Sequence, residues 1–197
     1  MSQEVINRIP KERRMIREFI FSNHESIYKK GKLDNKKESQ LGDERTTRRR
    51  NRMMRGGENG ESYKNLESGQ MIDQRNIYGK KFLVRDELIK YEWKITGNKK
   101  HILDYLVMEA QTTIEDTIFV TAWFTPQIPI QNGPSRFGGL PGLILELDQD
   151  DGNNNILATS IVLGEIDPDD IIEEPKKGKQ VNRKEFNNEG TRKSRNR

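Results

Sequence analysis

The chain has 197 residues, of which 31% are hydrophobic and 34% are charged, and its formal net charge is +4. This length suits a single domain with one modest core, and the polar composition predicts that a considerable share of the chain does not pack. The chain has no cysteine, which excludes a disulfide framework, a thiolate metal site and a thiol nucleophile.

Charge is segregated along the chain. Residues 1–80 hold 19 basic and 12 acidic side chains, residues 81–175 hold 7 and 17, and residues 176–197 hold 9 and 2. An acidic middle flanked by basic arms predicts a folded middle with solvated arms.

The N-terminal part of the chain predicts little regular structure. We expect an N-terminal arm over residues 1–18 and one early strand over residues 19–30, whose apolar side chains begin with Phe19 and Phe21. Residues 31–81 show no sustained strand or helix period and predict a flexible basic insert. The first thirty residues hold no uninterrupted apolar run, so the chain as written predicts no signal peptide, no membrane span and a cytosolic protein.

Residues 82–175 predict an antiparallel β core. Alternating apolar and polar residues recur between turn sequences such as TGNKK and DQDDGNNN, and residues 82–90 fit either a strand or a short helical turn. We therefore predict a mainly β fold, an antiparallel meander or curved sheet, followed by a frayed basic tail over residues 176–197. The segments expected as strands are YEWKI (91–95), HILDYLVMEA (101–110), DTIFVTAWFT (116–125), GLILEL (142–147) and ILATSIVLGEI (156–166).

The stretch FGGLPGLILEL, residues 137–147, gathers glycine and proline in front of a strand. The four residues Leu140 to Leu143 fit a type II β-turn, in which proline presets the first central residue and Gly142 takes the positive φ of the second. Turn chemistry accounts for every residue as a rigid strand entry. The alternative is a backbone-lined rim of a binding cleft, because exposed glycine amides also allow a ligand to approach closely.

The same stretch carries a family resemblance. The hexapeptide GLPGLI at residues 139–144 lies in a block, residues 121–147, that resembles the GLPGLI family of Gram-negative envelope proteins. YEWKI, IDPDDIIEEPKKGK and NRKEF resemble the family as well, so that the likeness extends over residues 19–190. It implies a periplasmic or outer-membrane location and a poorly defined function. Two departures stand out: the chain begins without the usual leader, and DYLVMEA replaces a glycine and a cysteine that relatives often have, so thiol chemistry does not carry over.

Aromatic residues of the expected strands give the main candidate ligand site. They make either the core of the sheet or the concave face of a curved sheet that holds an apolar ligand, as in half-barrel carriers of lipids. The order of strands is similar to that of LolA-type lipoprotein carriers. The candidate ligand-binding residues are Trp93, Tyr105, Trp123, Phe124, Gly139, Leu140, Pro141 and Gly142.

A second candidate surface is a run of arginines. Clustered arginines neutralise phosphates, so the run indicates a polyanion, which is nucleic acid, anionic lipid or lipopolysaccharide phosphate. The absence of aromatic stacking platforms and the acidic core weigh against nucleic acid, and a solvated loop is the alternative. The residues of this run are Arg48, Arg49, Arg50, Arg52 and Arg55.

No motif predicts catalysis, a metal site or a cofactor. DQDDGNNN lacks the ligands of a calcium loop at Gly152 and Thr159, no nucleophile elbow occurs, and His24 and His101 lie in polar surroundings. We therefore predict a non-enzymatic envelope protein that binds an apolar ligand or a protein partner. The alternatives are a nucleic-acid-binding protein that uses residues 45–55 and a hydrolase without an assigned nucleophile.

Overall fold

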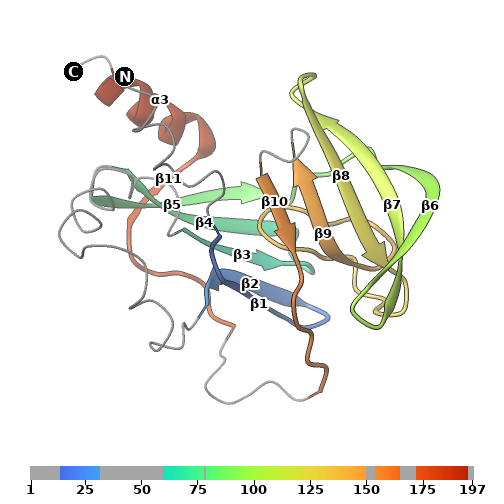
Figure 1. Cartoon of the computed structure of the whole chain (residues 1–197). Coiled ribbons are helices and arrows are strands. Elements are labelled where there is room, and N and C mark those ends of the chain that lie inside the picture. Colours follow the sequence, from blue (N-terminus) through green and yellow to red (C-terminus); the bar gives the residue numbers. More distant parts are fainter. Residues whose placement is uncertain (1–13, 32–59, 78, 150–153, 165–171, 195–197) are drawn as a thin grey trace, which may run out of the picture.

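The computed structural model describes residues 14–31, 60–77, 79–149, 154–164 and 172–194, with side chains described up to residue 189. Two β-sheets and one helix make up these parts of the chain (Figure 1). The first sheet, sheet A, runs in the order β1-β2-β3-β4-β5-β11, and the second, sheet B, in the order β10-β9-β8-β7-β6. The mainly β, largely antiparallel fold is thereby confirmed.

The strands divide between the two sheets as follows. Sheet A consists of β1 (Arg17–Phe21), β2 (Glu25–Lys30), β3 (Glu61–Asn65), β4 (Gln70–Ile77), β5 (Lys80–Glu87) and β11 (Lys179–Val181). Sheet B consists of β6 (Lys94–Ile102), β7 (Tyr105–Ile114), β8 (Ile118–Thr125), β9 (Leu143–Gln149) and β10 (Asn154–Leu157), and the helix is α3 (Arg183–Ser194).

Sheet A contains structure that the sequence pattern did not reveal. Residues 19–30, expected as one strand, belong to the hairpin β1–β2, and β3 and β4 lie inside the expected flexible insert 31–81. The physical reason is that two charged side chains, Lys64 on β3 and Asp73 on β4, take buried positions, with exposed fractions of 1% and 0%. Charged residues at buried positions break the alternation by which strands are recognised.

The predicted basic tail also folds in part. Strand β11 pairs in parallel with β5, and helix α3 follows it. Asn182 and Glu185 form reciprocal side-chain bonds to each other's backbone N–H, at 3.1 and 2.8 Å, which is a capping box at the start of α3. Phe186 of α3 packs edge-on against Phe82 of β5, so the helix is fixed to the sheet.

Sheet B is the expected meander, with three shifted boundaries. Strand β10 ends at Leu157, so the strand predicted over residues 156–166 is wrong beyond that residue. Strand β6 begins at Lys94, after the YEWKI aromatics, and runs through TGNKK, the expected turn, by means of an irregularity between Ile95 and Lys99. Gly97, at φ 89°, lies in that irregularity. The turn falls instead before Tyr105, where the chain enters β7. The alternation predicted for β8 is confirmed, because Val120, Ala122 and Phe124 are all buried.

Each face of sheet B carries a hydrophobic cluster. One cluster joins β7, β8 and β9 to the loop after β8. The other joins the opposite face to β1 and to the chain after β10. Buried members of the first are Ala110, Val120, Ala122, Phe124, Phe137, Leu140, Ile144 and Leu147, and those of the second are Ile102, Val107, Ile128, Leu143 and Leu145.

The second of these faces is concave. Strands β6 and β9 are separated by β7 and β8, which in a flat sheet would place them about 14 Å apart at roughly 4.8 Å per strand. Lys100 of β6 nevertheless forms an ion pair with Glu146 of β9, above the ring of Trp123 on β8. Side chains from β6 and β9 that meet over β8 are consistent with a sheet that curves toward them. Figure 1 shows this curl in β6, β7 and β8, and β6 and β10 pair with no further strand among the described residues, so the curved sheet stays open there.

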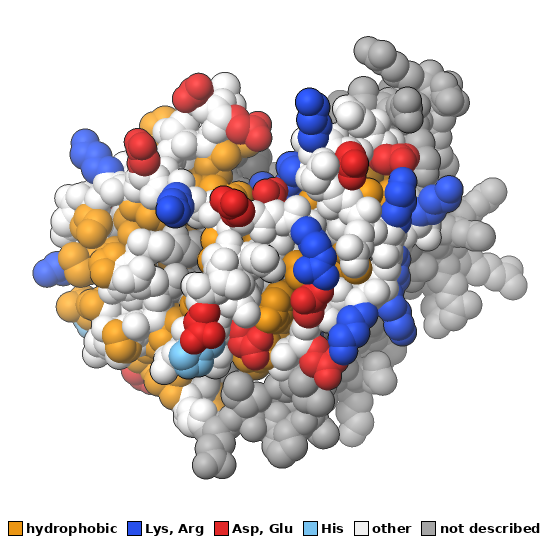
Figure 2. All heavy atoms as spheres, turned by 180° about the vertical axis from the view of Figure 1, so that it is seen from behind, with side chains coloured by type: hydrophobic (Ala, Val, Ile, Leu, Met, Phe, Trp, Pro, Cys, Tyr) orange, Lys and Arg blue, Asp and Glu red, His pale blue; other side chains and the backbone are white. Residues whose placement is uncertain are grey.

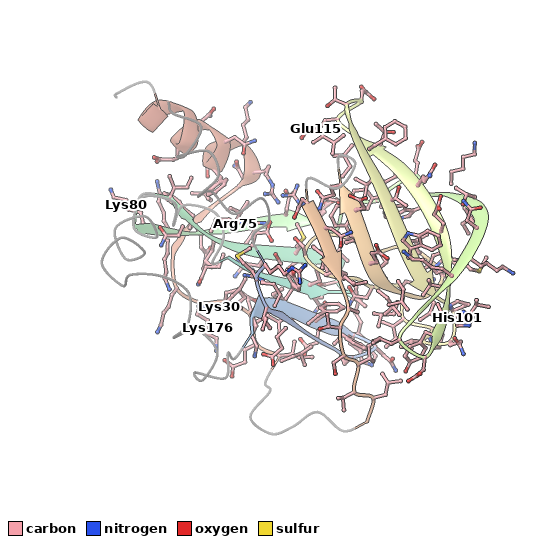
Figure 3. The ribbon with its side chains drawn as sticks, in the orientation of Figure 1. Lys30, Arg75, Lys80, His101, Glu115 and Lys176 are labelled. Atoms are coloured by element: carbon pink, nitrogen blue, oxygen red, sulfur yellow. The ribbon has the colours of Figure 1, made fainter. Side chains whose placement is uncertain are left out.

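Figure 3 gives the orientation of sheet B. Glu115 lies at the tip of the β7–β8 hairpin, and His101 lies at the opposite end of the sheet, where β6 ends. Glu115 and Asp116 take positive φ values of 52° and 56° in the hairpin turn.

Candidate functional site

The glycine-rich loop between β8 and β9 is held by long-range hydrogen bonds rather than by a type II turn. The Gly142 N–H donates to the Leu140 carbonyl at 2.7 Å, which closes a three-residue γ-turn around Pro141. The Leu143 N–H donates instead to the Ile128 carbonyl at 3.0 Å. The type II prediction is therefore wrong, because the donor that would close such a turn is already paired across the loop.

Two glycines in this region are required by close packing. A Cβ on Gly142 would lie 2.2 Å from the carbonyl oxygen of Thr125, and a Cβ on Gly133 would lie 2.8 Å from Cδ1 of Ile144. The loop thus lies directly on the backbone of the strand before it. Glycine is therefore required at these positions because the neighbouring atoms leave no room for a Cβ, and not only because glycine favours turns.

A buried lysine clamps this loop onto sheet A. The Lys64 ammonium group donates to the carbonyls of Gly133 and Phe137 at 2.6 and 2.7 Å, and its Nζ lies 5.6 Å from the ring centroid of Phe19. Burial lowers the pKa of Lys64 to about 7, and the charge of Asp73 opposes this shift. The clamp fixes both ends of the short segment from residue 133 to residue 137.

Asp73 neutralises the sheet around this clamp. It accepts a hydrogen bond from Ser62 Oγ at 2.6 Å and pairs with Arg75 at 3.2 Å and Arg183 at 3.3 Å. Burial alone would raise the pKa of Asp73, but Arg75, Ser62 and Arg183 hold it below its ordinary value. Figure 3 shows Arg75 on the side of sheet A that lies toward sheet B.

An aromatic stack closes the other side of the loop. Tyr91 stacks on Phe137 with ring centroids 5.1 Å apart and lies against Trp93 at 5.6 Å, and Trp93 Nε1–H donates to the Gly138 carbonyl at 2.9 Å. Burial raises the pKa of Tyr91 to about 12. Among the described residues, the Tyr91 hydroxyl is buried and has no hydrogen-bond partner.

An open groove of about 500 Å³ lies beside the clamped segment. Side chains of β1 and β2 line one side of it, and residues 154–162 line the other. Pro134 and Ser135, which the Lys64 clamp holds on both flanks, line it as well. We call residues 158–163, which follow β10, the strap.

The groove carries exposed apolar side chains. Met15 is 51% exposed, Leu157 is 52% exposed and Val162 is 88% exposed. The strap is attached to β9 by a hydrogen bond from the Ala158 N–H to the Leu145 carbonyl. Within the described parts of the chain, β1 and β10 are also the outermost strands of their sheets.

The structure does not gather the predicted ligand-binding residues into one site. Trp93, Phe124 and Leu140 belong to the cluster on one face of sheet B, and Tyr105 and Trp123 belong to the cluster on the other. Phe124 and Leu140 are 1% exposed, so they serve as core. Gly139, Pro141 and Gly142 shape the loop beside this core.

The structure also places the other candidate residues of the sequence analysis, apart from the arginine run. The arginine run 48–55 lies outside the described residues. His24 pairs with Glu67 at 2.7 Å on the surface, and His101 is exposed. Across the described ranges no group of three or more potential metal ligands occurs, and no helix there is long and apolar enough to cross a membrane. Figure 2 shows basic and acidic side chains interspersed on the back face of the molecule rather than gathered by sign.

Sequence reasoning missed the groove and its clamp. The groove joins residues 15–28 to residues 154–162, and no local pattern connects such distant segments. One signal for the clamp was present: Ser62 and Lys64 alternate with Tyr63, as residues of a strand with a polar buried face would. Polar residues at alternating positions are ordinarily assigned to the solvent face, so the signal pointed the wrong way.

Comparison with known proteins supports the central block. Residues 111–146 match the model of a family described as "Protein of unknown function (Porph_ging)". This range covers the last four residues of β7, all of β8, the glycine-rich loop and the first four residues of β9. The GLPGLI name therefore remains a resemblance, and no curated protein matches the chain.

Two solved structures share the fold. "Structure of PNGF-II in C2 space group" is similar with a TM-score of 0.57 at 19% identity, and "Structure of PNGF-II in P21 space group" with a TM-score of 0.57 at 18% identity. The likeness covers 85% and 91% of this chain but only 28% and 30% of those chains. This chain thus corresponds to less than a third of the solved proteins, and the likeness shows the fold alone.

Proposed function

We propose that this chain is a non-enzymatic binding module whose groove takes an extended segment of a partner polypeptide. The observation that carries the proposal is the groove between β1 and the strap, with Met15, Leu157 and Val162 exposed along it. Exposed apolar side chains that line a groove are typical of a surface that a partner covers.

The composition of the groove favours a polypeptide over a lipid. Its lining combines apolar side chains with polar ones, which include Ser62, Asn154 and Asn155, and the groove is partly open to solvent. A lipid chain prefers an enclosed apolar cavity, whereas an extended polypeptide presents both backbone amides and side chains. The outermost strands β1 and β10 border the groove and suit backbone pairing with such a segment.

The fixed wall of the groove gives the partner a defined register. Lys64 holds the carbonyls of Gly133 and Phe137, so Pro134 and Ser135 keep their positions before any partner arrives. Preformed binding surfaces lose less conformational entropy on association. By family resemblance we place this binding in the periplasm or at the outer membrane, and cell fractionation with an antibody to the chain tests that location.

Photo-crosslinking in the protein's own cells tests the function. The photoreactive residue p-benzoylphenylalanine replaces Val162 in the groove, and in a control chain it replaces Phe119, which is 59% exposed on β8 outside the groove. The proposal expects a discrete polypeptide adduct from position 162 and none from position 119. A lipid adduct at position 162 would overturn the polypeptide as the occupant of the groove and would favour an apolar ligand. No adduct, or equal adducts at both positions, would overturn the groove as a binding site.

A further inference from the structure

The concave face of sheet B holds a cation above an indole ring. Nζ of Lys100, which extends from β6, lies 4.1 Å from the ring centroid of Trp123 on β8. The same ammonium pairs with the Glu146 carboxylate of β9. A cation within about 6 Å of an indole face is attracted by the negative face of the ring.

A second carboxylate on this face has amide partners. Glu109 of β7 is 7% exposed, and its oxygens accept hydrogen bonds from Asn98 at 3.1 Å and Gln111 at 2.8 Å. The other carboxylate, Glu146, accepts from Asn155 at 3.4 Å. The cluster Asn98, Lys100, Glu109, Gln111, Trp123 and Glu146, which we call the concave cluster, therefore holds two carboxylates, of which Glu146 pairs with the ammonium and Glu109 with two amide groups.

Asp73, a second buried carboxylate among the described residues, has cationic partners instead of amides. Asp73 on sheet A is matched by two guanidinium groups, from Arg75 and Arg183. With two carboxylates and one ammonium among its six residues, the concave cluster has a formal charge of −1 beside the Trp123 ring. Such an arrangement attracts a further positive charge.

We propose that the concave cluster binds an organic cation, the ammonium or guanidinium end group of a ligand, in the place above Trp123 that Lys100 Nζ occupies. The exposed fractions of the side chains fit an exchange of this kind: Lys100 is 38% exposed and can extend into solvent, whereas Glu146 is 15% exposed and stays in the sheet. The site is distinct from the groove proposed above: the groove takes an extended polypeptide segment, whereas the concave cluster takes a cationic end group. Lys100 acts as an internal competitor that an incoming cation displaces.

Removal of Lys100 gives the sharpest test. Lys100→Met keeps the length of the side chain and vacates the place above the ring. Lys99→Met removes the same charge from the adjacent residue, whose side chain points to the other face of β6, and is the matched control. The probes are Nα-acetyl-lysine methylamide and Nα-acetyl-arginine methylamide, with the neutral Nα-acetyl-citrulline methylamide for comparison.

Indole N–H resonances in ¹H–¹⁵N spectra provide the readout. The chain has two tryptophans, so two indole signals are expected, and Trp123→Phe identifies the signal of the site. Trp93, whose indole donates to the Gly138 carbonyl, reports that each variant is folded. The proposal expects both cationic probes, and not the neutral one, to shift the Trp123 signal, with about tenfold tighter binding to Lys100→Met than to Lys99→Met.

A carboxylate variant completes the test. Glu146→Gln is expected to weaken binding of the cationic probes to the Lys100→Met chain by about tenfold while the Trp93 signal stays in place. A Trp123 signal that does not move in Lys100→Met with either cation would overturn the proposal, as would equal shifts with citrulline. Neither result bears on the groove, whose crosslinks are measured at Val162, so the two proposals can fail separately.

Discussion

The two walls of the groove are built on opposite principles. The wall at Pro134 and Ser135 is held by a buried ammonium, an aromatic stack and glycines that touch the neighbouring backbone. The strap, which lines the groove opposite β1 and β2, has exposed apolar side chains, and Val162 is 88% exposed. Under the proposed function, the fixed wall would set the position of the partner segment and the strap would adapt to it. The following predictions test this comparison.

The largest effect is expected at Gly142 on the fixed wall. Gly142→Ala would place its Cβ 2.2 Å from the Thr125 carbonyl oxygen, so we expect a loss of about 5 kcal/mol in the free energy of unfolding, measured by urea denaturation. Gly164 next to the strap is the matched control, since its φ of 147° is similar to the 157° of Gly142 but no atom of the described residues lies within 4 Å of its Cβ position. Gly164→Ala should cost about 1 kcal/mol. Equal losses would show that close packing does not fix this wall.

A pH dependence is expected from the lysine clamp. The unfolded chain keeps the Lys64 proton up to the ordinary lysine pKa of 10.5, whereas burial lowers the pKa of Lys64 in the folded chain to about 7. Between these values the unfolded state binds more protons, so stability rises with pH, on the order of 4 kcal/mol across the window, and is flat below it.

Lys64→Met should remove this rise. The variant has a second effect, because it leaves the carbonyls of Gly133 and Phe137 without their donor. This loss lowers the free energy of unfolding by a similar amount at every pH and therefore does not itself change the slope. Urea denaturation from pH 6 to pH 10 measures both effects, with Lys99→Met as the surface control. Parallel profiles for wild type and Lys64→Met would contradict a buried lysine that titrates in this range.

A gain in stability is expected at Tyr91. Its hydroxyl is buried without a partner, so Tyr91→Phe should raise the free energy of unfolding by about 1 kcal/mol. Tyr63→Phe is the opposite case, because the Tyr63 hydroxyl donates to Glu25 at 2.6 Å, and a loss of about 1 kcal/mol is expected there. Thermal unfolding of the two variants should shift in opposite directions; a loss at Tyr91 would reveal a partner for its hydroxyl.

The smallest effect on stability is expected on the strap. Val162→Glu should change the free energy of unfolding by less than about 0.5 kcal/mol, because the side chain is 88% exposed. The same change places a carboxylate in the groove, so a photoreactive residue at Leu157 should lose its adduct. A large loss of stability would show that the strap is part of the core.

Sequence reasoning captured sheet B better than sheet A, and the reason lies in particular residues. On β8 the alternation of Val120, Ala122 and Phe124 is uninterrupted, and the buried face follows from it directly. On β3 and β4, Lys64 and Asp73 occupy buried positions where a pattern search expects apolar residues. Their burial is tolerable only because carbonyls and arginines far away in the sequence satisfy them.

The same limit explains the partial success at the loop. The sequence shows that Gly142 serves a special backbone geometry. It does not show that Leu143 bonds to Ile128, nor that the Thr125 backbone lies against Gly142, because both contacts depend on how the loop returns across the sheet. The groove is a still longer-range property, since its walls come from opposite ends of the chain.

The parallel pairing of β11 with β5 has a consequence for the order of assembly. The chain leaves sheet A after β5, builds all of sheet B from consecutive antiparallel strands, and returns to sheet A only at Lys179. Sheet B has local connections and can form during synthesis, whereas sheet A is completed only after β11, which follows all of sheet B in the chain, has been synthesised. Until Arg183 reaches Asp73 and Asp86, the nascent chain holds a buried carboxylate without one of its counter-charges, so truncated products are expected to be prone to proteolysis.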